Sequence, residues 1–303
     1  MVDISVAISS LKLENPTLLA SGILGISPKT FMRIKKSGAG GIVTKSIGLK
    51  PNDGYSAPTL VEVEGGYLNA MGLPNPGCEA FSEELKEADW LDMPIVVSVF
   101  GSSTEELVKI VDTFEDTPCK AFELNLSCPH VSNVGVEVGS DPKSVYELTS
   151  AIKQKSKKPL FVKVTPMVPD VIEIAKAAEE AGADGITAVN TMKGMVIDLQ
   201  IGRPILHNRV GGLSGPALKP VAIRCVYELY KSLDIPIIGC GGVSTWEDAI
   251  EFFMAGATAV QVGTAIASKD LNLFQEIVDG IIKYLEKKGH DDLKGIIGIA
   301  HKR

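Results

Sequence analysis

The chain has 303 residues, in which 30 Lys and Arg stand against 37 Asp and Glu, so its formal net charge is −7. Apolar residues make up 45% and charged residues 22% of the chain. These values are typical of a globular protein and exclude a disordered, collagen-like or disulfide-stapled chain. The acidic balance argues against a nucleic-acid partner, because binding nucleic acid needs a basic face.

Cysteine usage and hydropathy indicate where the protein works. None of the five cysteines forms a C-x-x-C pair, so we expect no zinc site, no dithiol redox motif and no other bound metal. Free thiols are typical of a reducing compartment. Residues 1–16 lack the basic start and apolar block of a signal peptide, and no apolar run reaches the roughly 18 residues of a membrane span. We therefore expect a cytoplasmic protein without membrane contact.

Eight short apolar runs, rich in Val and Ile, recur along the chain, and an amphipathic stretch usually follows each one. They lack polar alternation, as expected for parallel strands that are covered on both faces. The runs occupy residues 17–21, 41–46, 95–101, 122–127, 160–165, 185–191, 235–242 and 259–264. Eight alternating strand and helix units predict an α/β fold, a closed (β/α)8 TIM barrel, in a single domain over residues 1–303.

Several expected helices carry capping signals at their ends. The pairs Ser27–Pro28 and Asp141–Pro142 predict an N-cap followed by the first helical residue. The segment Ser244–Glu247 predicts a capping box. Gly182 and Gly256 predict left-handed residues at the C-terminal ends of two helices.

Three further segments stand apart from the repeating units. Residues 47–77 and 192–216 form long connections, and connections of this length in a compact barrel are more often functional than idle. Residues 3–14 alternate in polarity. This alternation predicts a hairpin that closes the floor of the barrel.

Polar and charged side chains gather where the expected strands end, which is the end at which such barrels carry their active sites. Lysines and asparagines beside Val and Ile runs are costly to bury without partners. A single one of them can simply reach solvent, but the convergence of several favours a pocket for an anionic, hydrogen-bonding ligand. The residues are Ser21, Lys45, Ser46, Ser98, Asn125, Ser127, Cys128, Lys163, Asn190 and Thr191.

The last two expected strands end in glycine-rich segments, at 239–242 and 263–264. Barrels often bind phosphate with the loops after strands seven and eight, because glycines let backbone N–H groups approach it. The alternative is a pair of tight turns without a ligand. We expect a phosphate that belongs to a cofactor such as FMN. No G-x-G-x-x-G motif opens a helix after a strand, so we expect no Rossmann-type NAD site.

Cys128 follows the fourth expected strand in N-L-S-C-P-H and opens a segment that we interpret as a lid over about residues 129–141. A thiol titrates near about 8.5 and is partly thiolate at neutral pH, so Cys128 is a candidate general base. His130 is the rival base. We interpret Cys225 and Cys240 as small buried apolar residues, as most single cysteines are.

Four ordered motifs together resemble class 1 dihydroorotate dehydrogenases, and the resemblance covers essentially the whole chain. The motifs are N-A-M-G-L-P-N-P-G (69–77), N-L-S-C-P (125–129), V-N-T (189–191) and G-G-L-S-G-P-A-L-K-P (211–220). The resemblance implies oxidation of dihydroorotate to orotate in de novo pyrimidine biosynthesis, with one FMN per chain as hydride acceptor. It also implies a homodimer.

The family pattern, carried over to this sequence, implies roles for individual residues. Cys128 matches the catalytic base, and Lys163 would stabilise the negative charge of the reduced flavin. The residues that match FMN contacts are Ser21, Lys45, Ser46, Asn125, Lys163, Val189, Gly215, Gly241, Gly242, Gly263 and Thr264. The residues that match orotate contacts are Lys45, Asn69, Ala70, Met71, Gly72, Leu73, Asn125, Asn190 and Thr191. Ser98 stands where the family usually has Asn, and its shorter side chain can still donate one hydrogen bond to the flavin.

Residues 135–142, G-V-E-V-G-S-D-P, resemble the NAD-linked subclass, class 1B. In that subclass the catalytic subunit pairs with an electron-transfer subunit that carries FAD and a [2Fe–2S] cluster, giving a heterotetramer in which the partner supplies the NAD site. The alternatives are a fumarate-linked class 1A enzyme, a dihydropyrimidine dehydrogenase-like flavoprotein acting on a neutral pyrimidine, and a non-catalytic phosphate-binding barrel. Lys45, beside the N-A-M-G-L segment, favours a carboxylated substrate.

Overall fold

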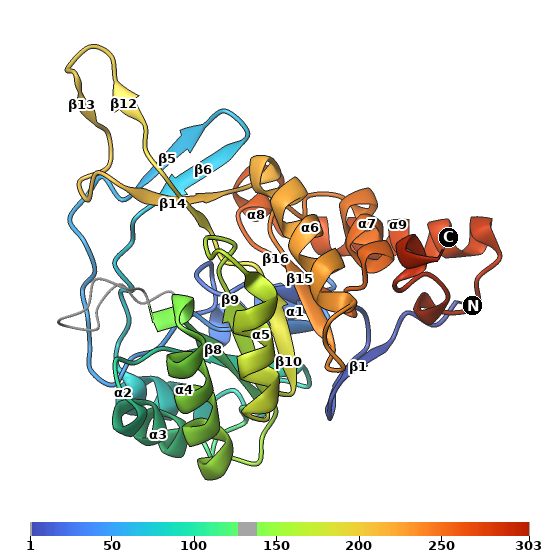
Figure 1. Ribbon diagram of the computed structural model, residues 1–303, viewed down its shortest axis with the longest axis horizontal. Helices are drawn as coiled ribbons and strands as arrows, with labels where there is room; N and C mark the ends of the chain where they lie inside the picture. Colours follow the sequence, from blue (N-terminus) through green and yellow to red (C-terminus); the bar gives the residue numbers. More distant parts are fainter. Residues whose placement is uncertain (1, 127–137, 303) are drawn as a thin grey trace.

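The computed structural model describes residues 2–126 and 138–302, and its centre is a closed barrel of eight parallel strands with helices outside it (Figure 1). The strands are β3 (Thr17–Leu19), β4 (Gly41–Val43), β7 (Ile95–Val99), β8 (Ala121–Asn125), β9 (Leu160–Val164), β10 (Gly185–Ala188), β15 (Ile237–Cys240) and β16 (Ala259–Val262). Their order around the barrel is β10-β15-β16-β3-β4-β7-β8-β9. Each expected apolar run contains one of these strands, except that β8 begins one residue before its run, and this agreement confirms the predicted TIM barrel.

Helices cover the barrel because each presents an apolar face to the strands. Phe252 and Phe253 of one helix and Phe274 of another are fully buried in this outer core layer. The helices are α1 (Pro28–Lys36), α2 (Cys78–Lys86), α3 (Thr104–Thr113), α4 (Pro142–Lys155), α5 (Val171–Glu180), α6 (Lys219–Tyr230), α7 (Trp246–Ala255), α8 (Ala265–Lys269) and α9 (Leu273–Lys288), with short 3-10 turns at Val138–Ser140, Pro216–Leu218, Leu293–Gly295 and Ile299–His301. Across residues 2–126 and 138–302, each helix lacks the combination of length and hydropathy that spanning a membrane requires.

The helix ends agree with the capping predictions in all but one case. Ser27 and Asp141 are the N-caps of α1 and α4, and each is followed by proline. The expected capping box at Ser244 is wrong, because the chain is still extended at the next residue. Thr245 is the N-cap of α7 and shares the box with Asp248. Gly256 ends the same helix with φ of 122°, and Gly182, just after α5, has φ of 91°, as predicted.

A hairpin closes the amino-terminal end of the barrel, as the alternating sequence predicts. Its strands, β1 (Val6–Ile8) and β2 (Leu11–Leu13), pair antiparallel. Ile8 packs in one apolar cluster with Leu18 and Phe161, the second residues of two barrel strands. The hairpin therefore fills this end of the barrel in the part of the chain that the structure describes, and the cavities discussed below lie at the carboxyl end of the strands.

The two long connections meet in a second, antiparallel sheet over the carboxyl end of the barrel (Figure 1). Its strands are β5 (Leu60–Val63), β6 (Gly66–Asn69), β11 (Met192–Gly194) and β14 (Gly211–Ser214), in the order β11-β14-β6-β5; β12 (Ile197–Asp198) and β13 (Arg203–Pro204) form a protruding hairpin beyond it. Gly66 must be glycine, because an added Cβ would lie 1.9 Å from the Ser214 carbonyl oxygen. The sheet roofs the barrel mouth and brings the 69–73 segment above it.

Candidate active site

Two adjoining cavities open at the carboxyl end of the barrel. The inner cavity, of about 360 Å³, lies against the barrel interior and includes Lys163 and the glycines after β15 and β16. The outer cavity, of about 800 Å³, lies toward the second sheet and includes Phe100, Met167 and Gly212. The two cavities share the lining residues Asn69, Met71, Leu73, Asn125, Asn190 and Thr191. Molecules bound in the two cavities would therefore touch.

Residues predicted to contact a flavin come together in the inner cavity. Ser21, Lys45, Ser46, Asn125, Lys163, Val189, Gly215, Gly241, Gly242, Gly263 and Thr264 all line it. Ser98 is placed differently: it is fully buried, and its hydroxyl lies 2.9 Å from that of Ser46. In this position Ser98 holds Ser46, which itself faces the cavity.

Residues predicted to contact orotate come together in the outer cavity. Asn69, Ala70, Met71, Gly72, Leu73, Asn125, Asn190 and Thr191 all line it, whereas Lys45 faces the inner cavity. Asn52 also lines the outer cavity and is absent from the prediction. Its amide donates to the carbonyl oxygens of Gly72 and Leu73, at 2.8 and 3.3 Å. Asn52 therefore holds the 69–73 segment in shape.

The glycines of the inner cavity are needed for close backbone approach. Gly241 and Gly242 have φ of 133° and 77°, and an added Cβ on Gly242 would lie 2.7 Å from the carbonyl oxygen of Gly215. An added Cβ on Gly263 would meet only Ala20 within 4 Å, so its open side faces the cavity. Glycine backbone that lines a cavity in this way suits a phosphate group.

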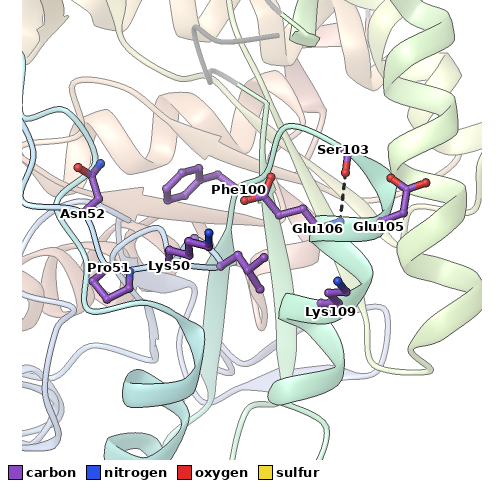
Figure 2. A pocket seen from close by; sticks show the side chains of 10 residues that line it. Lys50, Pro51, Asn52, Phe100, Ser103, Glu105, Glu106 and Lys109 are labelled. Carbon is purple, nitrogen blue, oxygen red and sulfur yellow. Dashed lines mark hydrogen bonds between the residues drawn. The ribbon is translucent and has the colours of Figure 1, made fainter. Parts of the chain in front are cut away.

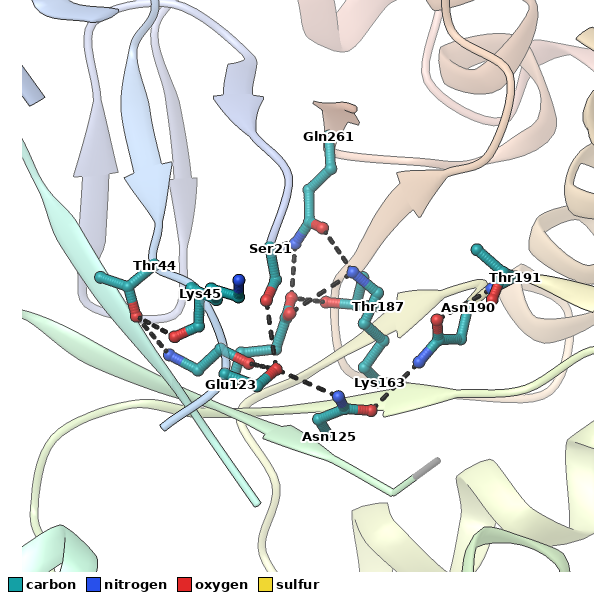
Figure 3. A network of polar contacts seen from close by, with 12 residues as sticks. Ser21, Thr44, Lys45, Glu123, Asn125, Lys163, Thr187, Asn190, Thr191 and Gln261 are labelled. Carbon is teal, nitrogen blue, oxygen red and sulfur yellow. Dashed lines mark hydrogen bonds and ion pairs between the residues drawn. The ribbon is translucent and has the colours of Figure 1, made fainter. Parts of the chain in front are cut away.

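A buried polar network lies at the inner end of the same cavity (Figure 3). Lys163 donates to Glu123 at 3.4 Å and to Gln261 at 2.9 Å. Glu123 also accepts from Thr187 at 3.0 Å and from the Gln261 amide. Glu123, Thr187 and Gln261 are absent from the predicted site, although Glu123 and Gln261 are visible in the sequence as single polar residues inside the apolar runs F-E-L-N-L-S and A-V-Q-V-G-T.

Burial and neighbouring charges shift the acidity of three groups in the inner cavity. Burial alone lowers the pKa of Lys45. Burial also acts to lower the pKa of Lys163, but Cys240 and Glu123 beside it outweigh burial and raise that pKa above its ordinary value. Burial raises the pKa of Cys240. Cys225 is buried as predicted, whereas the interpretation of Cys240 as a small buried apolar residue is wrong, because Cys240 is only partly buried and lines the cavity beside Lys163.

Amides connect the two cavities. Asn190 donates to the side-chain oxygen of Asn125 at 3.0 Å, and Asn125 donates to the hydroxyl of Ser46 at 3.1 Å. The backbone N–H of Thr191 donates to the Asn190 side chain at 2.8 Å. These bonds fix the orientation of amides that face a ligand. Ser127, Cys128, His130 and residues 129–137 of the expected lid lie outside the described residues.

A third cavity, of about 500 Å³, adjoins the outer one and shares Asn52, Phe100 and Glu106 with it (Figure 2). Its acidic wall belongs to the first turn of α3, where Ser103 caps the helix by accepting from the Glu106 backbone at 3.2 Å. Its lysines, Lys50 and Lys109, lie beside these carboxylates. Because both signs of charge are present, this cavity shows no preference for an anion.

Position and chemistry together define a class of protein: a barrel enzyme that can hold a phosphate-bearing cofactor within its carboxyl end and a polar substrate directly above it. The family model for dihydroorotate dehydrogenase matches residues 3–285. The chain belongs to the dihydroorotate dehydrogenase family, which confirms the resemblance in the sequence and the predicted enzyme class.

Individual relatives match over the full length of the chain. The dihydroorotate dehydrogenase B (NAD(+)), catalytic subunit, of Pyrococcus furiosus is 50% identical over 301 residues, covering 99% of this chain and 100% of the relative. The protein of the same description from Methanosarcina mazei is 48% identical over 296 residues, covering 97% and 94%. That from Methanothermobacter thermautotrophicus is 47% identical over 297 residues, covering 97% of each chain.

Proposed function

We propose that this chain is the catalytic subunit of an NAD-linked dihydroorotate dehydrogenase, with FMN in the inner cavity and dihydroorotate in the outer one. The observation that carries the proposal is the convergence of the predicted flavin residues on one cavity and of the predicted orotate residues, Lys45 excepted, on an adjoining one. The two cavities share Asn125 and Asn190. This arrangement suits direct transfer between a substrate and a cofactor.

The inner cavity fits FMN in the chemistry of its lining. The backbone at Gly241–Gly242 and Gly263–Thr264 would hold the phosphate, and Lys163 with Asn125 would hold the polar edge of the ring. Bound FMN supplies an acceptor for the hydride that leaves the substrate. The Lys163 ammonium would stabilise negative charge that develops on the reduced cofactor.

The outer cavity suits a small anionic substrate with several hydrogen-bonding groups. Asn69, Asn190 and Thr191 present amides and a hydroxyl that would orient the substrate's ring. Lys45 lies two residues after β4 and lines the inner cavity, which adjoins the outer one, and its ammonium would pair with a substrate carboxylate directed toward it. This pairing favours dihydroorotate over a neutral pyrimidine, and family membership supports the same choice.

Oxidation of dihydroorotate removes a proton from one ring carbon and a hydride from its neighbour. We assign proton removal to Cys128 as general base, with His130 as the alternative; the assignment rests on the N-L-S-C-P-H sequence and the family resemblance. Asn125, three residues before Cys128, lines both cavities. The amide of Asn125 and the proposed base therefore lie close together along the chain.

We also propose that electrons leave this chain through a partner subunit carrying FAD and a [2Fe–2S] cluster, in an assembly built on a homodimer of the catalytic chain. The relatives' description as a catalytic subunit of an NAD(+) enzyme supports this partner. The absence of a G-x-G-x-x-G motif that opens a helix after a strand also supports it, because NAD then needs another binding site.

The proposal is tested with the purified chain loaded with FMN. Dihydroorotate should drive reduction of an artificial dye acceptor, while NAD added to the same chain should stay oxidised. Titrating the oxidised flavin with orotate should perturb its absorption spectrum at lower concentration than titration with uracil. NAD reduction by the chain alone would contradict the two-subunit proposal, and a preference for uracil would favour the neutral-pyrimidine alternative.

A further inference from the structure

Four buried polar side chains from four barrel strands meet at the inner end of the inner cavity and point toward one another (Figure 3). Glu123 and Thr187 are 0% exposed, Gln261 is 1% exposed and Lys163 is 5% exposed. Burying a carboxylate and an ammonium costs free energy, and well-packed apolar residues often stabilise a core better than a buried ion pair does. The network is therefore more readily explained by function than by stability.

The four residues divide into two that face the cavity and two that lie behind them. Lys163 and Gln261 line the cavity, and Glu123 accepts hydrogen bonds from both. Thr187 donates to the same carboxylate at 3.0 Å from β10, which lies on the far side of β9 from β8. Glu123 is thus placed to act on a ligand through Lys163, whose ammonium it holds together with Gln261.

The charged and titratable groups around Lys163 come from three strands or the residues just after them. Glu123 lies on β8, Cys240 ends β15, and Lys45 follows β4 and lines the same cavity. Burial raises the pKa of Cys240 and so favours its neutral thiol, although the Lys163 ammonium beside it acts in the opposite direction. Glu123 is the carboxylate that accepts directly from the buried Lys163 ammonium, at 3.4 Å, and places a negative charge beside it.

We propose that Glu123 is a positioning residue that keeps Lys163 protonated and aimed at the cofactor in both oxidation states. This inference rests on the proposed function, since the inner cavity must hold FMN. When a fixed cation keeps the reduced ring anionic, reduction takes up two electrons and one proton. Without the Glu123 charge, the buried ammonium would lose its proton beside the neutral oxidised ring and regain it beside the reduced anion. Reduction would then take up a second proton.

The test measures the midpoint potential of bound FMN against pH, from about pH 6 to about pH 9, and derives the protons taken up per flavin reduced. We expect a count near one for the native chain, and a higher count than the native one at the alkaline end, rising toward two, for Glu123→Gln; any proton that Lys45 contributes is common to both chains. Glu123→Asp keeps the charge on a shorter side chain and should give an intermediate count. If Glu123→Gln does not fold, Glu123→Asp carries the test.

Matched controls separate this role from a merely structural one. Thr187→Val removes one hydrogen bond to Glu123 but keeps both charges. The number of protons taken up per flavin reduced should therefore stay near one in this variant. Thr149→Val removes a buried hydroxyl from α4 and should change nothing. A native proton count in folded Glu123→Gln, or in Glu123→Asp if only that variant folds, would overturn the inference.

Binding of FMN to the apoprotein can be monitored by the quenching of flavin fluorescence. This measurement distinguishes a failure of the proposed function from a failure of the positioning role of Glu123. If the native apoprotein binds no FMN, the proposed function is contradicted, and this inference with it. If the native chain binds FMN and the Glu123 variants keep the native proton count, only the positioning role of Glu123 is wrong.

Discussion

The side-chain amide of Asn190 donates a 3.0 Å hydrogen bond to the side-chain oxygen of Asn125, at the boundary that the two cavities share. Asn125 ends β8, and Asn190 follows β10, so the bond ties together two strands that flank β9. Asn125 in turn donates a hydrogen bond to the hydroxyl of Ser46, at 3.1 Å. A ligand in either cavity therefore meets amides whose orientation is already fixed.

This relationship predicts that Asn190→Ala weakens substrate binding more than cofactor binding. The change removes one ligand-facing amide and leaves the Asn125 oxygen without this donor, at a cost of about 1–3 kcal/mol. We expect KM for dihydroorotate to rise about 5- to 100-fold, with FMN affinity changed far less. The control is Asn208→Ala, an exposed amide at the rim of the outer cavity, which should leave KM near its native value. Equal effects of the two substitutions would contradict the role of Asn190.

Lys45 gives a prediction with a defined pH dependence. Burial lowers the pKa of Lys45, so its positive charge is present at low pH and is lost as pH rises through a pKa below the usual lysine value. Attraction for a carboxylate should weaken in the same direction, and KM for dihydroorotate should increase toward alkaline pH.

Lys45→Met should raise KM about 10- to 100-fold, as expected for a lost charge-assisted hydrogen bond, and should remove the alkaline increase that Lys45 causes. Steady-state kinetics from neutral to alkaline pH provide the measurement. Lys109→Met, at an exposed lysine of the third cavity, is the matched control. A Lys45→Met enzyme that keeps the native KM and its alkaline increase would remove Lys45 from the substrate site.

Cys128→Ala should slow flavin reduction by dihydroorotate about 10²- to 10⁴-fold, the usual contribution of a general base, while orotate still perturbs the flavin spectrum. In the native enzyme, reduction should accelerate as pH rises toward a thiol pKa of about 8.5. Anaerobic stopped-flow absorbance measures both effects. Should His130→Ala lose the acceleration with pH and Cys128→Ala keep it, histidine would be the base instead.

The glycine backbone that lines the inner cavity at Gly241, Gly242 and Gly263 predicts that Gly242→Ala weakens FMN binding. The added methyl would lie 2.7 Å from the Gly215 carbonyl oxygen and 2.8 Å from the Lys219 Cβ, at a φ of 77° that L residues rarely adopt. We expect at least a tenfold loss of FMN affinity by fluorescence titration. Gly289→Ala introduces a similar φ of 74°, with nothing within 4 Å of the added atom. It should lower stability by about 1 kcal/mol without loss of FMN; FMN loss in both variants would point to general strain.

The start of α7 provides a test of stability alone. The sequence 244–248 offers two overlapping capping boxes, and the structure selects Thr245 with Asp248. Thr245→Ala should lower the free energy of unfolding by about 1 kcal/mol. Ser244→Ala removes a hydroxyl that makes only a 3.3 Å bond to the Gly242 carbonyl oxygen, so chemical denaturation should reveal a smaller loss. A larger loss of stability for Ser244→Ala than for Thr245→Ala would indicate that Ser244 is the N-cap after all.

The barrel could be predicted because its strands are covered on both faces. In β7 and β9 all five residues are buried, so each strand is mainly apolar, with a single polar residue, Ser98 or Lys163, and a helix follows each. The capping box was predicted one residue too early, at Ser244, because Ser244 and Thr245 can both cap a helix and only the backbone geometry decides between them.

The site residues could be predicted where polar groups end strands, and less well where they lie inside them. Glu123 and Gln261 escaped prediction because one polar residue in an apolar run is compatible with either a partner or an error in strand assignment, and partners that lie 138 residues apart have no local signal. Ser98 was assigned to the flavin, but its direction toward Ser46 depends on how β4 and β7 pack.

The claim that the inner cavity holds FMN in contact with dihydroorotate is tested most directly by an absorption spectrum. The purified chain is reconstituted with FMN and mixed with dihydroorotate without oxygen. If the inner cavity holds FMN and the outer cavity holds the substrate in contact with it, the oxidised flavin band should bleach and orotate should form in equal amount. A chain that retains no FMN, or whose bound FMN stays oxidised at saturating dihydroorotate, would contradict the claim.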